Sequence, residues 1–187
     1  MVDEETKTLW SQLLAKGMEG KHKGDKLPVL PSVLTDWASW KKSYPKTTVI
    51  KLSRTGREFR NDFYSDPAKF VVGLSKLNIA KAWPFDQLRK QPLVNDEFDK
   101  RDVLIYFVGE TSAAYVYDRK LEGTTLEFKF NAGKVVDGKT QTEWDLSTGV
   151  AIAGKMKGKR LKALPAIPSF RKSWMTFYPN SEVWELK

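Results

Sequence analysis

The chain has 187 residues, a formal net charge of +9 at pH 7 and no cysteine. Hydrophobic residues make up 41% of it, with seven Trp, six Tyr and ten Phe, which predicts a folded globular protein rather than a disordered one. The lack of cysteine excludes disulfides, thiolate metal sites, iron–sulfur clusters and cysteine nucleophiles, and no apolar run approaches the roughly 20 residues that cross a bilayer.

The first residues, MVDEETKTLW, lack the basic and then apolar order of a secretory signal. We therefore expect neither a signal peptide nor a membrane-spanning segment in this chain. The compartment stays open, because cysteine-free proteins occur in reducing and in oxidising surroundings.

An internal repeat organises the chain: residues 3–49 align without a gap with residues 137–183. Trp, Gly and Pro dominate the identical positions, and such self-similarity indicates a duplicated structural unit. The identical pairs are Asp3/Asp137, Thr6/Thr140, Thr8/Thr142, Trp10/Trp144, Gly20/Gly154, Lys21/Lys155, Lys23/Lys157, Gly24/Gly158, Leu27/Leu161, Leu30/Leu164, Pro31/Pro165, Ser39/Ser173, Trp40/Trp174, Tyr44/Tyr178, Pro45/Pro179 and Val49/Val183.

Each copy predicts a glycine-rich loop, then a short helix, then a strand. Thr35 in the first copy and Ser169 in the second occupy the position of a helix N-cap. Within each predicted helix a Trp and a Tyr are four residues apart, so their rings lie on one face. We expect these rings, and the Trp before each loop, to be core anchors rather than a platform for a ligand. The six anchors are Trp10, Trp40, Tyr44, Trp144, Trp174 and Tyr178.

The two copies are joined by residues 50–136. In this stretch AKAWPFDQLRK predicts a strand that passes into a short helix, with Pro84 in the first turn. The apolar run VLIYFV and the alternating segments after it predict a β-meander over about residues 103–130, with Leu126, Phe128 and Phe130 on one face. Together these patterns predict one α+β domain over residues 1–187, mainly antiparallel β with short helices, in which the two related segments share a core.

The repeated pattern resembles a bacterial and archaeal family, the domain-of-unknown-function family 3179, in which such a segment occurs twice. The resemblance implies no activity that can be assigned to a residue. It implies an extracytoplasmic location for full-length members. The second copy carries the pattern at Trp144, Gly149, Ile152, Gly154, Gly158, Leu161, Leu164, Pro165, Trp174, Tyr178, Pro179 and Val183, and the first keeps Trp10, Gly20, Gly24, Leu27, Leu30 and Pro31.

The resemblance also implies that strands precede Trp10 in longer members, so we expect this chain to be a partial or shortened member. An edge left without those strands is expected to pair with another strand or with a second copy. Family members commonly carry a cysteine-containing segment in that part, so no metal or redox role is assigned to this chain.

One stretch has the spacing of a phosphate-binding loop: Gly149, four residues, Gly154 and Lys155. Such a loop needs Ser or Thr next, to hold magnesium, and then a helix whose N-terminus faces the phosphates. Met156 takes the hydroxyl position, and KGKRLKALP carries glycine and proline where the helix should run. We therefore expect no nucleotide site and no cofactor there.

Catalytic side chains are few. His22 is the only histidine and is expected to be a solvated loop residue, which excludes triads and multi-histidine metal sites. Asp118, Asp137, Glu143 and Asp145 cluster in sequence, and paired carboxylates can act as acid and base. Turns and ion pairs are the preferred interpretation, so we predict no catalytic and no metal-binding residues, with a carboxylate-dependent hydrolase or sugar-active enzyme as the third alternative.

The two glycine loops are rich in lysine, and such loops bind phosphate or sulfate groups without reading a sequence. The first hypothesis is a non-catalytic structural or ligand-binding protein, whose basic loops are merely solvated. The alternative is a polyanion-binding protein. Its anion-binding residues would be Lys21, Lys23, Lys155, Lys157, Lys159 and Arg160.

Overall fold

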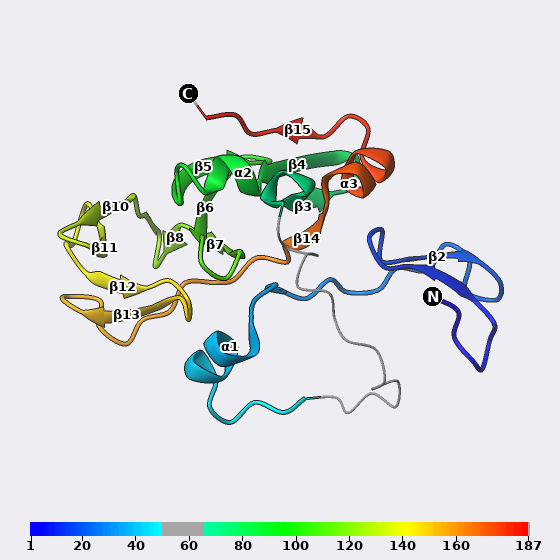
Figure 1. Ribbon diagram of the computed structural model, residues 1–187, viewed down its shortest axis with the longest axis horizontal. Coiled ribbons are helices and arrows are strands. Elements are labelled where there is room, and N and C mark those ends of the chain that lie inside the picture. Colours follow the sequence, from blue (N-terminus) through cyan, green and yellow to red (C-terminus); the bar gives the residue numbers. More distant parts are fainter. Residues whose placement is uncertain (50–65, 187) are drawn as a thin grey trace.

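A computed structural model describes residues 1–49 and 66–186, and this part of the chain is an α+β fold of mainly antiparallel strands (Figure 1). The helical elements are short. They are α1 (Trp37–Ser43), a 3-10 helix η2 (Pro67–Lys69), α2 (Phe85–Leu88) and α3 (Arg171–Phe177). None of the described helices is long and apolar enough to cross a membrane.

Two sheets form the middle of the molecule. In the first, β3 (Phe70–Lys76) and β4 (Ile79–Pro84) make a hairpin, β14 (Ile167–Phe170) pairs antiparallel with β3, and β15 (Glu182–Val183) runs parallel to β4. In the second, β6 (Arg101–Val108) lies between β5 (Leu93–Phe98) and β7 (Ala113–Asp118). A buried cluster joins the two sheets. Its largest fully buried members are Trp83, Phe85 and Phe107.

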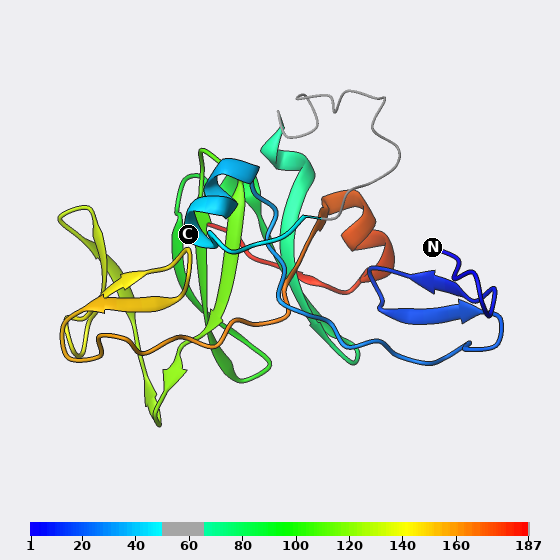
Figure 2. The ribbon, with the colours of Figure 1, turned by 90° about the horizontal axis from the view of Figure 1, so that it is seen from below.

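Hairpins extend from this middle at opposite ends of the molecule, as both ribbon views show (Figures 1 and 2). One end holds β1 (Leu9–Ser11) and β2 (Lys16–Glu19). The other holds the sheet β10 (Phe128–Asn131), β11 (Lys134–Asp137), β12 (Glu143–Asp145) and β13 (Val150–Ala153), near the small hairpin β8 (Lys120–Leu121) and β9 (Thr124–Thr125).

The predicted β-meander is right for its first two strands and wrong in its last part. β6 and β7 pair as expected, but β10 leaves the sheet and pairs with β11. Leu126 and Phe128 are buried, whereas Phe130 is 49% exposed, because β10 runs out of the core towards its hairpin. Pro84 precedes α2 as its N-cap rather than lying in the first turn.

The predicted helix caps are wrong by one residue. Asp36 caps α1 and accepts a hydrogen bond from the Ser39 N–H at 2.8 Å, so a carboxylate takes the place expected for Thr35. α3 begins after Phe170 and has no side-chain cap. Ser169 is unavailable as a cap because it pairs with β3 as part of β14.

The strands predicted after the helices differ between the copies. In the second copy Glu182–Val183 forms β15, as expected. In the first copy residues 47–49 are not in a strand, and the rest of the predicted TTVIKL strand lies outside the described residues.

The outer edge of β1 is bonded by the first residues of the chain. The backbone groups of Met1 and Trp10 exchange hydrogen bonds at 2.7 and 3.0 Å, and the Asp3 N–H donates to the Thr8 carbonyl at 3.1 Å. These bonds occupy part of the strand edge near Trp10. Self-association through that edge stays a prediction, and no contact among the described residues favours it.

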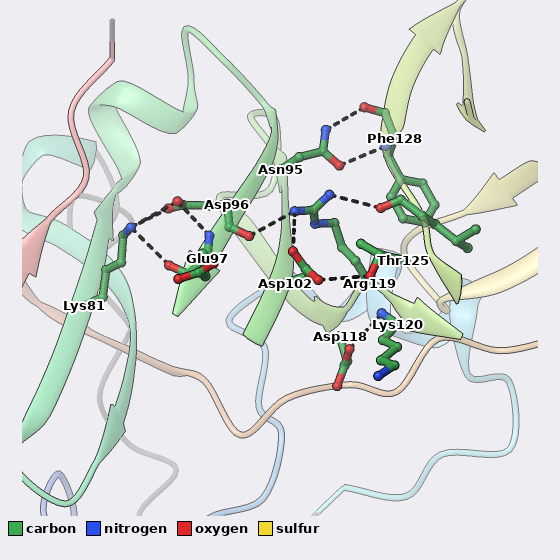
Figure 3. A network of polar contacts seen from close by, with 11 residues as sticks. Lys81, Asn95, Asp96, Glu97, Asp102, Asp118, Arg119, Lys120, Thr125 and Phe128 are labelled. Carbon is green, nitrogen blue, oxygen red and sulfur yellow. Dashed lines mark hydrogen bonds and ion pairs between the residues drawn. The ribbon is translucent and has the colours of Figure 1, made fainter. Parts of the chain in front are cut away.

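A polar network ties the two central sheets to the segment that follows β7 (Figure 3). The buried Lys81 ammonium lies 2.9 Å from Asp96 and 2.8 Å from Glu182, so it holds β15 against β4 and β5. Burial alone would lower the pKa of Lys81, but the hydrogen bonds to Glu182 and Asp96 outweigh it and raise that pKa. Arg119 pairs with Asp102 at 3.2 Å at the far side of the network.

Candidate functional site

A carboxylate organises the start of the hairpin in the second copy. Asp137, fully buried, accepts hydrogen bonds at 2.6 to 3.2 Å from the N–H and hydroxyl of Thr140, the N–H of Thr142 and the indole of Trp144. Burial alone would raise the pKa of Asp137, but these hydrogen bonds more than offset it and lower that pKa. The Asp137 carboxylate therefore stabilises the turn between β11 and β12.

The first copy repeats this arrangement closer to solvent. Asp3 accepts from the N–H and hydroxyl of Thr6, the N–H of Thr8 and the indole of Trp10 at 2.6 to 3.1 Å. The hydrogen bonds from Thr6 are the main cause that lowers the pKa of Asp3. Trp10 is half-buried, whereas Trp144 in the equivalent position is 3% exposed.

One glycine packs against this turn in both copies. Gly154 has a φ of +94°, and a Cβ there would lie 2.9 Å from the Thr142 Cα; Gly20 has the same φ, and its Cβ would lie 2.9 Å from the Thr8 Cα. Only glycine fits both the left-handed conformation and the close approach. Backbone conformation and close packing therefore explain the glycine at both positions, and no phosphate group is needed to explain it.

The stretch with phosphate-loop spacing leads into no helix. β13 ends at Ala153, Lys155 lies in an exposed turn, and the next described helix, α3, begins only at Arg171. The helix that a phosphate-binding loop needs is therefore not present among the described residues directly after this stretch. The side chain of His22 is 39% exposed in its loop, and its Nδ1 lies 2.9 Å from the Asp25 carboxylate.

The aromatic anchor of the second copy is completely enclosed. Trp174 has no exposed surface, and a Cβ on Gly73 of β3 would lie only 2.3 Å from its ring. Its indole donates to the Ser181 hydroxyl at 2.8 Å, and its ring centroid lies 4.5 Å from that of Tyr178. This ring fixes α3 on the sheet.

In the first copy the same pair is only partly covered. Trp40 is half-buried, donates to the Thr47 hydroxyl at 2.9 Å and lies 4.3 Å from the ring of Tyr44. The two rings line a small cavity together with Tyr115 and Tyr117 of β7. α1 therefore covers β7 with a looser version of the contact that α3 makes with β3.

Each hairpin contacts the helix of the other copy. The Tyr178 hydroxyl donates to the Leu13 carbonyl at 3.1 Å, and Leu13 packs in the cluster around Trp174. Ser147, which aligns with Leu13, lies 3.4 Å from the Ser43 hydroxyl at the end of α1. The two copies thus brace one another across the molecule.

The four carboxylates weighed as catalytic groups are each bonded within their own surroundings. Asp118 accepts from the N–H two residues further on (Figure 3), and Glu143 pairs with Lys134 at 2.7 Å. Asp145 accepts from the N–H and hydroxyl of Ser147 at 2.9 and 2.7 Å. With Asp137 closed inside its turn, the arrangement fits the turn and ion-pair interpretation.

The lysine loops lie at the two opposite ends of the molecule and do not converge on one site (Figure 1). Lys21, Lys23, Lys155 and Lys157 are exposed. In the second loop the Lys159 ammonium pairs with Glu122, and the Arg160 guanidinium donates to the Thr148 carbonyl at 2.6 Å. In the described residues no three or more acidic, His or Cys side chains form a group that would hold a metal.

Side chains from separate elements converge instead around the turn between β6 and β7. Two adjoining hollows, of about 260 and 580 Å³, share Arg89 and Glu110, and we call them together the β6–β7 groove. The inner hollow adds Thr35 and Asp36 from the start of α1, and the outer one adds Tyr106 and Phe130. Backbone geometry shapes this turn, in which Ser112 has a positive φ of 53°.

Several polar groups of this groove have no side-chain partner within the described residues. The Thr35 Oγ1 is buried and has no hydrogen-bond partner among the described residues, a state that proteins generally avoid. Within the same part of the chain, neither Arg89 nor Glu110 forms an ion pair through its side chain, although both are exposed.

Burial and hydrogen bonds shift the pKa values of three groups in or near the groove. Burial is the main cause that raises the pKa of Tyr106, with Asp145 and Glu110 adding to it. Burial likewise raises the pKa of Tyr115 to about 12. The hydrogen bonds from Ser39 lower the pKa of Asp36.

Sequence reasoning missed this groove. Its residues come from the ends of α1, α2, β6 and β10, far apart in the chain, and none of them belongs to a motif. The one local signal was the turn GETS at residues 109–112, which directly follows a buried strand.

The chain matches a known family model. The family model described as "Protein of unknown function (DUF3179)" matches residues 1–69 and 61–181. The chain belongs to DUF3179. No curated protein and no solved structure matches it.

Both family matches contribute to the β6–β7 groove of this DUF3179 chain. Thr35 and Asp36 lie in the first matched segment, and Arg89, Glu110 and Phe130 lie in the second. The groove is therefore assembled from two DUF3179 segments rather than contained in one.

Proposed function

We propose that this DUF3179 protein is a non-catalytic, ligand-binding domain whose ligand lies in the β6–β7 groove. One observation carries the proposal: side chains from four elements converge there with polar atoms that lack partners in the described residues, including the buried Thr35 hydroxyl. Concave sites with a few convergent polar groups beside apolar walls are typical of ligand-binding pockets.

The organisation of the chain supports one binding unit. Two contacts join residues 3–49 to the remainder of the chain, one between Leu13 and Tyr178 and one between Ser43 and Ser147. We therefore propose that residues 1–187 act as a single domain. In this domain α1, from the first copy, provides one wall of the groove, and β6, from the segment between the copies, provides the other.

A fragment screen by ¹H–¹⁵N NMR tests the groove. We expect bound fragments to shift the amide signals of Gly109, Glu110 and Ser112. Replacing Arg89 by alanine is expected to weaken the best fragment about tenfold, since one charged hydrogen bond contributes roughly 1.5–3 kcal/mol. Lys90→Ala is the matched control, because Lys90 is the neighbouring exposed cation and lies outside the groove. Fragments that shift only other regions would contradict the proposal.

Polyanion binding is the second candidate, and the charge distribution favours one loop. Residues 150–162 hold four lysines and one arginine and no Asp or Glu, whereas the first loop carries Glu19 and Asp25 among its lysines. A polyanion would therefore bind the β12–β13 hairpin more strongly than the β1–β2 hairpin.

Charge neutralisation distinguishes the two loops. We expect glutamine at Lys155, Lys157, Lys159 and Arg160 to lower heparin affinity about tenfold or more at low salt, and to flatten its salt dependence, because fewer counterions are released. Glutamine at Lys21 and Lys23 serves as control and is expected to change affinity less than about twofold. Equal loss in both variants, or no salt-sensitive binding at all, would argue against a specific basic loop.

A further inference from the structure

We infer that the ligand of the β6–β7 groove is an uncharged oligosaccharide. The inference rests on the proposed function and adds the chemical class of the ligand. Three features of the groove carry it: an aromatic wall, a set of polar groups of mixed sign, and strands whose backbone groups are already bonded.

The aromatic wall offers flat apolar faces next to water. Phe130 is 49% exposed at the outer end of the groove, and Tyr106 is half-buried beside it. The axial C–H groups of a pyranose ring form a flat apolar patch that packs on such a face, because the face of an aromatic ring is electron-rich and C–H groups are weakly positive.

The polar groups suit hydroxyls better than charges. Asp36 and Glu110 accept hydrogen bonds, Arg89 donates them, and the Thr35 hydroxyl does either. Two carboxylates with one guanidinium repel a polyanion, so phosphate and sulfate esters are disfavoured in this groove. A neutral sugar presents vicinal hydroxyls that both donate and accept, and it therefore matches this mixed set.

β6, the strand that leads into the groove, has no free edge for an extended peptide. β6 is bonded to β5 on one side and to β7 on the other. The side chain of Asn95 occupies both backbone groups of Phe128 in β10, with bonds of 2.7 and 2.8 Å (Figure 3). A peptide therefore cannot add as a further strand at β6 or at Phe128, which favours a ligand that side chains recognise, such as a saccharide.

Calorimetric titration of the full chain with neutral hexasaccharides tests the inference. The probes are the hexamers of β-1,4-glucose, α-1,4-glucose and β-1,4-N-acetylglucosamine. We expect one of them to bind and to shift the amide signals of Gly109 to Ser112. Phe130→Ala should bind it about fivefold to tenfold more weakly, through loss of the stacked face. Phe177→Ala, which removes an exposed ring of α3, should bind like the unchanged protein.

The outcomes separate the ligand class from the site. If fragments shift the groove but no neutral hexasaccharide binds, the inference fails and the proposed function stands. A hexasaccharide that binds equally well to Phe130→Ala and Phe177→Ala lies elsewhere, which also overturns the inference. A sulfated hexasaccharide that shifts the groove more strongly than the neutral ones would show that the charge argument is wrong. If neither fragments nor sugars shift the groove, both proposals fail.

Discussion

Replacing Trp174 with alanine is expected to lower the free energy of unfolding by about 3–5 kcal/mol, the usual loss for a fully buried Trp. The ring has no exposed surface, stacks on Tyr178 and donates to Ser181, so its removal leaves a cavity and takes one hydrogen bond from the Ser181 hydroxyl. Urea unfolding followed by circular dichroism measures the change, with the midpoint as the readout.

A substitution at Gly73 tests the same packing contact from the strand. A methyl group on Gly73 would lie 2.3 Å from the Trp174 ring, so Gly73→Ala alone should destabilise the protein through a clash. In the Trp174→Ala background the clash partner is gone, and the same substitution should be nearly neutral. Additive losses in the double mutant would show that the two residues do not pack as described.

Trp40 is the matched control for Trp174. It has the equivalent position, the same stacking on a Tyr and the same indole hydrogen bond to a hydroxyl, but it is only half-buried. Trp40→Ala should therefore cost clearly less stability than Trp174→Ala, because less apolar area leaves water on folding. Equal losses would mean that exposure does not decide the contribution of these rings.

Asp137→Ala is the second large effect, with an expected loss of about 3 kcal/mol. Four hydrogen bonds reach this buried carboxylate, and alanine removes the acceptor of the Thr140 and Thr142 N–H groups and of the Trp144 indole. Asp3→Ala removes the same set of bonds nearer to solvent, where water can replace them, and should cost less. Thermal unfolding of both variants at pH 7 compares them.

The pH dependence of Asp137 follows from the direction of its pKa shift. Its folded pKa lies below the ordinary value of 3.8, so the stabilisation is complete above that value and is lost as the pH falls through the folded pKa. The unfolding free energy of the unchanged protein should therefore decline below about pH 4. Asp137→Ala should decline less steeply there, and an identical slope would show that Asp137 is not the titrating group.

The elements that could be predicted are those with a strong local pattern. The apolar run at residues 103–108 and the alternation at residues 113–118 specify β6 and β7, because such periods need no distant partner to be recognised. The cap of α1 was misplaced because the helix begins one residue later than expected, where the Asp36 carboxylate accepts from the Ser39 N–H at 2.8 Å.

The groove could not be predicted because its chemistry arises only in three dimensions. Arg89 ends one short helix, Glu110 lies in a turn and Asp36 caps another helix, so no spacing along the chain connects them. The lysine loops were predicted to bind anions because their charged residues are close together in the sequence. In the fold the two loops lie at opposite ends of the molecule, and Lys159 forms an ion pair with Glu122. Adjacency in sequence was a poor guide to convergence in space.

The two contacts between the copies can form only after most of the chain has been synthesised. Leu13 and Tyr178 are 165 residues apart, and Ser43 and Ser147 are 104 apart. At roughly 5–20 residues per second, a ribosome releases Leu13 on the order of ten seconds before its partner exists. During that interval the first hairpin and Trp40 are without their final contacts, so the nascent chain has to be shielded from aggregation until its last helix is made.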